Sequence, residues 1–221
     1  MCRLLMLFNP DGVNPNSHLE SFRKVSQDST EFQGHGWGCS WLDGSNRWHC
    51  YHNISPIWED RKSDFPSTRV FLAHARSAFR DEGIAVENNM PFTDDHSVFI
   101  FNGELQGVRV KAEGRIGAEK IFNTIRRLDH GDLAQAVERG VMVLNKRTRY
   151  IRALNFFLAD CKEIHLCSLF NETPEYFQLR ESQSDGTTII CSQPYPDTDM
   201  QWTSIPNNTL RSIPITSEPR P

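Results

Sequence analysis

The sequence predicts an α+β protein in which two antiparallel sheets pack against each other and helices cover the outside. Strand-like runs come first, two consecutive helical segments follow, and strand-like runs then return. This order differs from the alternating strands and helices of βαβ proteins. Runs 69–75 and 97–101 are apolar on both strand faces, as in strands buried between two layers. The length of 221 residues suits one domain spanning 1–221, with a sizeable core.

The first half of the chain combines strands with one helix. Residues 2–8 form a short apolar run that ends at Asn9-Pro-Asp-Gly, a strong turn signal. Ser17-His-Leu-Glu has the pattern of a capping box, and the apolar residues after it recur at helical spacing. Residues 36–42 and 47–52 flank Asp43-Gly-Ser-Asn, which predicts a hairpin.

The second half begins with two helices. Apolar residues recur at helical spacing in 117–128 and again in 132–144, where Asp132 is a suitable N-cap. The remaining predicted strands are 154–159, 163–169, 175–180 and 187–192. Residues 213–221 are predicted to form a tail.

Composition excludes several classes of function. The net charge is −4, and no basic stripe of the kind found in duplex-binding proteins stands out, so we expect no nucleic-acid partner. No apolar run approaches the roughly 18–20 residues that span a bilayer, and the N-terminus lacks a secretory signal. We therefore expect a cytoplasmic protein with no membrane partner and with its six cysteines reduced.

We expect neither a metal site nor a cofactor. No Cys-x-x-Cys pair occurs, and the densest group of potential ligands is His35, Cys39, His49, Cys50 and His52. Residues 47–52 are strand-like, which places His49 and Cys50 on opposite faces, where they cannot ligate one ion without distortion.

Cys2 is the first candidate nucleophile because of its position. Removal of Met1 would make Cys2 the first residue and join its thiol to a free α-amine through one Cα. Such an amine, with a reference pKa of about 7.7–8.0, can accept the thiol proton directly or through one water. The other five cysteines fall in strand-like runs, where burial suppresses thiol reactivity.

Several segments, taken in order, resemble the class II glutamine amidotransferases, which are N-terminal-nucleophile (Ntn) hydrolases. They are Met1-Cys-Arg-Leu-Leu, His35-Gly-Trp-Gly, Ala73-His-Ala-Arg-Ser-Ala, Glu87-Asn-Asn-Met-Pro-Phe, Phe101-Asn-Gly-Glu-Leu and Gly117-Ala-Glu-Lys-Ile-Phe. The Glu87 element and the C-terminal Cys191-Ser-Gln-Pro-Tyr-Pro are similar to the stand-alone branch of that family. The resemblance spans nearly the whole chain and implies a four-layer αββα sandwich.

The resemblance also implies a set of site residues. Cys2 would attack the side-chain amide carbon of a γ-glutamyl group, and the Asn102 amide and Gly103 N–H would hold the oxyanion. Arg76 would bind the substrate α-carboxylate in a bidentate contact. Gly36 and Trp37 would line the pocket.

The sequence departs from the family pattern at three positions that bear on the substrate. Phe79 replaces a small hydroxyl or amide residue, and Met90 replaces a histidine. Gly117 stands where the family has the aspartate that meets the α-ammonium of the substrate. Glu82, Glu87 or Glu113 could supply the missing carboxylate, or the substrate could lack a free α-amine.

Three functions remain open from the sequence. In the first, the chain would hydrolyse glutamine and supply ammonia to a synthase on another chain. In the second, it would hydrolyse a γ-glutamyl peptide or thiol, as stand-alone members of the family it resembles do. In both cases the partner is a small γ-glutamyl molecule, with a separate synthase or peptidase subunit as a further partner. Alternatively, it is an inactive Ntn-fold binding or regulatory subunit.

Overall fold

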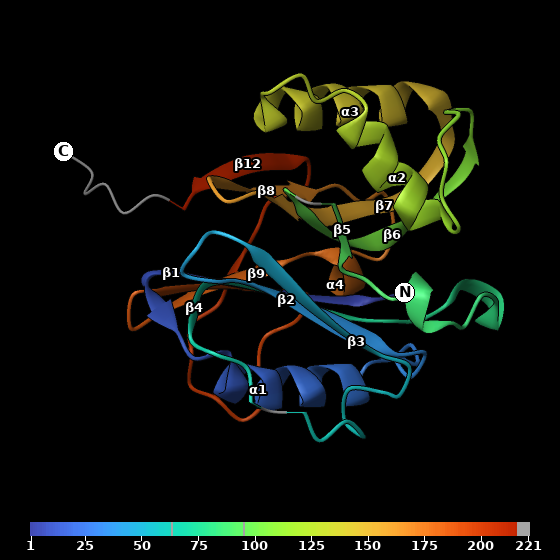
Figure 1. Cartoon of the computed structure of the whole chain (residues 1–221). Coiled ribbons are helices and arrows are strands. Elements are labelled where there is room, and N and C mark those ends of the chain that lie inside the picture. Colours follow the sequence, from blue (N-terminus) through green and yellow to red (C-terminus); the bar gives the residue numbers. More distant parts are fainter. Residues whose placement is uncertain (63, 95, 216–221) are drawn as a thin grey trace.

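Two antiparallel sheets lie face to face in the computed structural model, which describes residues 1–62, 64–94 and 96–215. Helix α1 covers the outer face of the seven-stranded sheet, and α2 and α3 cover the outer face of the five-stranded sheet (Figure 1). The four layers are therefore helix, sheet, sheet and helix. The predicted α+β sandwich is confirmed.

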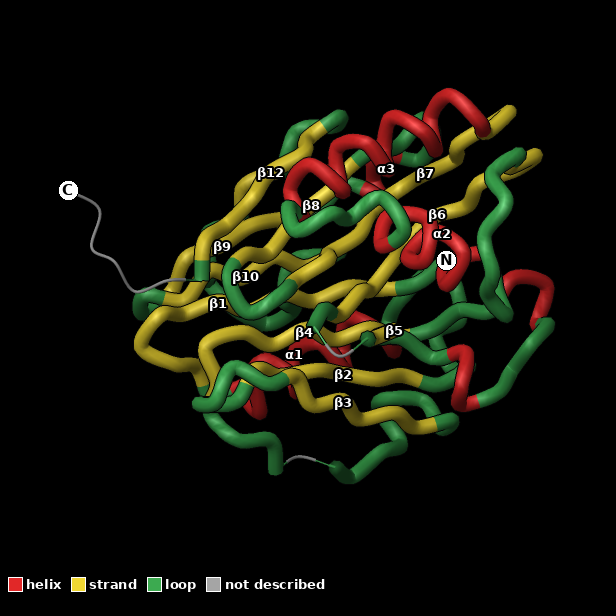
Figure 2. The backbone as a smooth tube through the Cα atoms, turned by 45° about the horizontal axis from the view of Figure 1, so that its top comes forward, coloured by secondary structure: helices red, strands yellow, loops and turns green. Residues whose placement is uncertain are grey.

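The seven-stranded sheet has the order β11-β9-β10-β1-β4-β2-β3, and the five-stranded sheet has the order β12-β8-β7-β6-β5 (Figure 2). The strands are β1 (Arg3–Val13), β2 (Trp37–Leu42), β3 (Trp48–Asn53), β4 (Thr68–Ala75), β5 (Phe92–Thr93), β6 (Val98–Val108), β7 (Thr148–Ala159), β8 (Glu163–Ser168), β9 (Arg180–Ser184), β10 (Thr187–Cys191), β11 (Thr203–Ser204) and β12 (Thr209–Pro214). The helices are α1 (Pro15–Gln27), α2 (Gly117–Arg126), α3 (Leu133–Arg147) and α4 (Pro174–Phe177), with 3₁₀ turns η1 (Phe79–Asp81) and η2 (Val86–Asn88).

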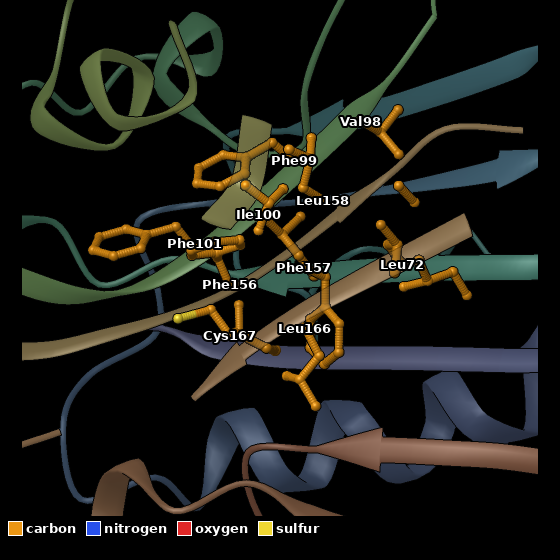
Figure 3. Packing of buried hydrophobic residues seen from close by; sticks show 14 of the residues in the cluster. Leu72, Val98, Phe99, Ile100, Phe101, Phe156, Phe157, Leu158, Leu166 and Cys167 are labelled. Atoms are coloured by element: carbon orange, nitrogen blue, oxygen red, sulfur yellow. The ribbon is translucent and has the colours of Figure 1, made fainter. Parts of the chain in front are cut away.

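The main core lies between the sheets and continues beneath α2 and α3 (Figure 3). Strand β1 shows how the two faces of a sheet are used, because successive side chains alternate between them. Leu4 and Met6 belong to the core between the sheets, whereas Leu5 and Leu7 pack with α1. The side chain of Cys2, two residues before Leu4, therefore begins on the face between the sheets.

Strand β6 has a free edge over most of its length, and this edge positions the site. Its neighbour β5 pairs only with Phe99 and Val98, so β6 has no partner on that side after Phe99. On its other side β6 pairs with β7, where the register shifts between Glu104 and Leu105. Bulges of this kind are common beside functional sites because they redirect side chains.

Several predicted element boundaries are wrong in detail. Strand β1 continues through the Asn9 turn to Val13 after a shift in register, and Asn14, not Ser17, caps α1 with Pro15 as its first residue. Residues 175–180 do not form a strand: Pro174–Phe177 is a helical turn, and the strand begins at Arg180. The predicted tail also begins too early, because β12 reaches Pro214. Residues 216–221 of that tail lie outside the described residues.

None of the helices in the described ranges combines the length and the apolar character that crossing a membrane requires.

Candidate active site

Cys2 lies immediately before β1, at the end of the sandwich where the N-terminus sits (Figure 1). Its Sγ lies 3.7 Å from the Ser77 carbonyl oxygen, and the residue lines an open cavity of about 1340 Å³. Burial raises the pKa of the Cys2 thiol, whereas the N-terminal ammonium and the Arg76 guanidinium act in the opposite direction. The pKa of the thiol is raised on balance, and the ammonium that opposes this belongs to Met1, so Arg76 is the cation that stays beside the thiol when Met1 is removed.

Met1 is held in place next to this thiol. Its α-ammonium pairs with the Glu31 carboxylate, and its carbonyl oxygen accepts hydrogen bonds from Gln33 Nε2 and the Tyr176 hydroxyl. With Met1 present, the Cys2 nitrogen is part of a peptide bond and cannot accept a proton.

Arg76 follows β4 and lies beside Cys2, because Arg3 pairs with Ala75 in the adjacent register position. The guanidinium donates to the Gly83 carbonyl oxygen at 2.8 Å and to Asn89 Oδ1 at 3.2 Å, and the residue is 4% exposed. No carboxylate in the described part of the chain pairs with it. Arg76 is therefore a positioned cation at the cavity wall that can bind an anionic group.

Asn102 occupies β6 and is 1% exposed, yet neither its amide nitrogen nor its amide oxygen has a hydrogen-bond partner. Phe99 stacks on Phe122 of α2, so odd-numbered residues of this strand face the helices. The Asn102 side chain consequently faces the other sheet, which carries Cys2 and Arg76. Buried amides are rarely left without partners. Asn102 itself does not line the cavity, whereas its neighbours Phe101 and Gly103 do.

The Gly103 N–H points to the free edge of β6. Gly103 is opposite Leu154, whose own N–H donates to Leu169 on the far side of β7. In an antiparallel ladder, such a pair exchanges no hydrogen bonds, so the N–H of Gly103 points away from β7. Gly103 lines the cavity. A Cβ at this position would lie 2.1 Å from the Ala153 carbonyl oxygen, so the local backbone requires glycine.

Gly36 and Trp37, which we expected to line the pocket, are not among the residues that line this cavity. The Trp37 side chain lies on the opposite face of β2, fully buried beneath α1, with Nε1 donating to Asp60 at 2.9 Å. Gly36 supports the site indirectly, because its carbonyl oxygen accepts the Arg76 N–H at 2.9 Å. Its φ is +102°, and a Cβ would lie 2.1 Å from Asn89 Nδ2, so only glycine fits there.

Phe79 and Gly117 do line the cavity. Phe79 is 60% exposed, and Gly117 is the first residue of α2. No atom lies within 4 Å of the position that a Gly117 Cβ would occupy. Glu82 and Glu113 also line the cavity, whereas Glu87 lines a separate, smaller depression.

Cys39, His49, Cys50 and His52 lie on a regular hairpin, in which Cys50 pairs with Ser40 and His49 pairs with Trp41, whereas His35 precedes it. His49 contacts Asp43, and His52 contacts the Pro91 carbonyl oxygen. No group of three or more metal-ligating side chains occurs among the residues the structure describes.

Sequence reasoning did not identify Glu31, Gln33, Asn89 or Tyr176 as site residues. Asn89 lies inside the Glu87-Asn-Asn element and could have been noticed as a second polar residue there. The other three have no linear signal, because they approach Cys2 from sequence separations of about 30 and 175 residues.

No family model matches the sequence, and no curated protein matches it either. Solved structures do match. Glutamine PRPP amidotransferase from B. subtilis superposes with a TM-score of 0.68 at 13% identity, over 98% of this chain and 50% of that one. The fold is that of the class II glutamine amidotransferases.

Two smaller structures share this fold over nearly their whole length. A glutamine aminotransferase class-II domain protein from Silicibacter pomeroyi gives a TM-score of 0.61 at 16% identity, covering 96% of this chain and 94% of that one. A predicted glutamine amidotransferase from Pseudomonas aeruginosa gives 0.54 at 12% identity, covering 95% and 92%. The chain thus spans about half the length of the PRPP enzyme and nearly all of the two class II amidotransferase-fold proteins.

Proposed function

We propose that the chain, once Met1 is removed, hydrolyses a γ-glutamyl amide through a thioester on Cys2. The convergence of four groups carries this proposal: Cys2, Arg76, the Asn102 amide and the Gly103 N–H. They come from the ends of β1 and β4 in one sheet and from β6 in the other. Each of the four has the chemistry that one step of amide hydrolysis needs.

The Cys2 thiolate adds to the amide carbon, and the tetrahedral oxyanion accepts hydrogen bonds from Asn102 Nδ2 and the Gly103 N–H. The carbon–nitrogen bond then breaks, and the leaving nitrogen takes the proton that the Cys2 α-amine received from the thiol. Water attacks the thioester and releases the γ-carboxylate product and the free thiol. Arg76 holds the α-carboxylate throughout.

Cavity size and charge favour a substrate larger than glutamine. The cavity of about 1340 Å³ exceeds the roughly 300–1,000 Å³ of typical small-molecule sites. Seven basic and four acidic side chains line the cavity, although the whole chain has a net charge of −4. The basic residues are Arg76, Arg80, Lys111, Arg115, Lys120, Arg127 and Arg152, and the acidic ones are Glu31, Glu82, Glu104 and Glu113. Arg115 is paired with Glu119, and Arg152 is paired with Glu104 and Glu172. Without these pairs, basic side chains still outnumber acidic ones in the lining. A γ-glutamyl compound with an anionic leaving group, such as a peptide with a free carboxylate, complements this wall.

Two observations favour a second candidate function, in which the chain is an inactive binding or regulatory subunit. Met1 is bound by three side chains, and Gly117 leaves the α-ammonium side of the site without the family carboxylate. In this reading Met1 stays in place and the cavity binds a ligand without turnover.

One experiment separates the two functions. The intact mass shows whether Met1 is present, and release of glutamate from γ-glutamyl peptides is measured by mass spectrometry. We expect the processed chain to turn over, and the Cys2→Ala variant and a variant with one alanine inserted between Met1 and Cys2 to be inactive. The insertion keeps the thiol and moves the α-amine away from it. Retention of Met1 in the natively expressed chain, or equal turnover by the insertion variant, would contradict the proposal.

A further inference from the structure

Three side chains form a preorganised binding site for the backbone that precedes the Cys2 nitrogen. Glu31 binds the Met1 α-ammonium, while Gln33 Nε2, at 2.7 Å, and the Tyr176 hydroxyl bind the Met1 carbonyl oxygen. Gln33 is 0% exposed and Tyr176 is 7% exposed. The three come from the segment between α1 and β2 and from α4. We refer to Glu31, Gln33 and Tyr176 as the N-terminal clasp.

The clasp contains an unused acceptor. Four oxygens lie within hydrogen-bond distance of Gln33 Nε2, which has two N–H groups: the Met1 and Glu31 carbonyl oxygens at 2.7 Å each, Tyr176 Oη at 3.1 Å and Ser29 Oγ at 3.2 Å. The buried Gln33 Oε1 has no hydrogen-bond partner in the described residues. An unpartnered buried acceptor is destabilising.

Removal of Met1 vacates the position of its carbonyl oxygen. The departing carbonyl carbon is bonded to the Cys2 nitrogen, so its oxygen occupies a position next to the new α-amine. The Tyr176 hydroxyl then loses its acceptor, and Gln33 Nε2 loses one of the oxygens around it. A water near the vacated position accepts from both groups. The Glu31 carboxylate contacts the Met1 nitrogen, which is three covalent bonds from the nitrogen that becomes the new amine.

We propose that the clasp positions the general base: Glu31 pairs with the ammonium form of the Cys2 α-amine, and Gln33 and Tyr176 hold the water that links amine and thiol. This inference rests on the proposed function and assigns positioning roles within it. The thiol proton passes to the water while a water proton passes to the amine, so the water is regenerated. The resulting ammonium later gives its proton to the leaving nitrogen.

Other charged and titratable groups also face this corner. They are Arg3 of β1, His74 of β4, Arg76 directly after β4, Glu104 of β6 and Arg152 of β7. Arg3 lies over the Tyr176 ring, and Arg152 pairs with Glu104. Glu31 is the described carboxylate that contacts the N-terminus, so its removal changes the charge at the amine most directly.

Glu31→Gln tests the charge part of the proposal. The variant no longer stabilises the ammonium, so the acidic limb of the kcat/KM profile should move to lower pH, by roughly 0.2 to 0.7 pH unit. Glu20→Gln is the matched control, because Glu20 pairs with Arg23 on α1, away from the cavity. An unchanged acidic limb in Glu31→Gln would overturn this part.

Tyr176→Phe and Gln33→Met test the water part. Each should lower kcat by about tenfold or more with little change in KM, consistent with the size of general acid–base effects. Tyr150→Phe is the control, because its hydroxyl contacts Glu172 outside the cavity lining. Thermal unfolding verifies that each variant is folded, and Gln33→Met decides the outcome if Tyr176→Phe does not fold. Loss of kcat no greater than in Tyr150→Phe would overturn the assignment.

Different results would contradict the proposed function and the role of the N-terminal clasp. If the processed wild-type chain neither turns over γ-glutamyl peptides nor reacts at Cys2 with an electrophilic glutamine analogue, the proposed function fails and the clasp role falls with it. If wild type is active and all clasp variants keep its pH profile and kcat, the clasp role alone is wrong.

Discussion

Cys2 differs from the other cysteines in what surrounds its sulfur. Burial raises the pKa of Cys50 and Cys191 to about 11 and that of Cys167 to about 12, and it also raises the pKa of Cys39 well above its usual value. At Cys2, the same effect of burial is opposed by two positive charges. Cys161 lies in a turn, not in a strand as the sequence suggested, and is partly exposed.

An electrophilic glutamine analogue should therefore label Cys2 alone in the processed chain. Under the proposed function, labelling requires both a thiolate and the cavity beside it, and Cys161 does not line that cavity. Peptide mapping by mass spectrometry locates the label, with a small neutral alkylating agent as the comparison for simple exposure. Labelling at Cys39 or Cys161 with Cys2 unmodified would contradict the assignment.

Asn102→Ala should lower kcat by about 10²–10³ with a much smaller change in KM, because the amide acts mainly on the oxyanion. The same substitution should not lower thermal stability in proportion to its burial, because it removes two unpartnered polar atoms. Arg76→Ala should chiefly raise KM. Turnover of Asn102→Ala within about twofold of wild type would place the oxyanion hole elsewhere.

At the scale of elements, the start of α2 controls the side of the cavity opposite Cys2. Its N-cap residue, Ile116, makes no side-chain capping bond, and the Gly117 position has open space around it. A carboxylate at Gly117 would meet both the unpaired N–H groups of the first turn and the cavity.

Gly117→Asp should lower KM for free glutamine, which we expect to be millimolar or higher in wild type because a buried ammonium needs a partner. It should also stabilise the protein by about 0.3–1 kcal/mol through the helix dipole. The measurements are kcat/KM for glutamine and for a γ-glutamyl dipeptide, and the free energy of unfolding. If wild type already binds glutamine tightly and the variant only impairs it, Glu82, Glu113 or another acid provides the contact.

Strand β4 contains a further titratable group, His74, which is fully buried between the sheets. Burial lowers its pKa from 6.5 to about 3, so the unfolded chain binds a proton that the folded chain does not. Stability should therefore fall as pH decreases below 6.5, by about 2 kcal/mol between pH 7 and pH 5 from this residue. Urea unfolding at both pH values should show a smaller loss in His74→Leu than in wild type. Since burial also lowers the pKa of His18 and His165, an equal loss in both proteins would assign the effect to those residues.

At the scale of the molecule, the cavity is positively charged although the chain is acidic overall. γ-Glutamylglycine and γ-glutamylglycinamide differ mainly in the charge of the leaving group and make a matched pair of substrates. We expect kcat/KM to be several-fold higher for the anionic peptide, with the difference decreasing at high salt. Lys111→Gln and Lys120→Gln should reduce the preference, whereas Lys146→Gln, outside the cavity lining, should not. Equal rates for the two substrates would exclude charge selection.

Local signals in the sequence predicted most elements. The hairpin at 36–52, the helices at 117–128 and 132–144 and the Asp132 cap depend on neighbouring residues, and all are present in the structure. Predictions failed where distant contacts decided the conformation. Residues 174–177 turn into a helix because Tyr176 and Phe177 pack against Ala153 and Phe170, and 209–214 form a strand because they pair with β8.

By itself, the sequence determined the fold class, the candidate nucleophile and the ordered motifs, since these follow from spacing along the chain. Only the tertiary structure decided which of those residues meet. The pairing of β1 with β4 places Arg76 beside Cys2, and the free edge of β6 exposes the Gly103 N–H. Alternation along β2 turned Trp37 away from the cavity, and the fold brought Glu31, Gln33 and Tyr176 around Met1. Contacts between residues far apart in the chain depend on strand register and layer packing, which local sequence does not encode.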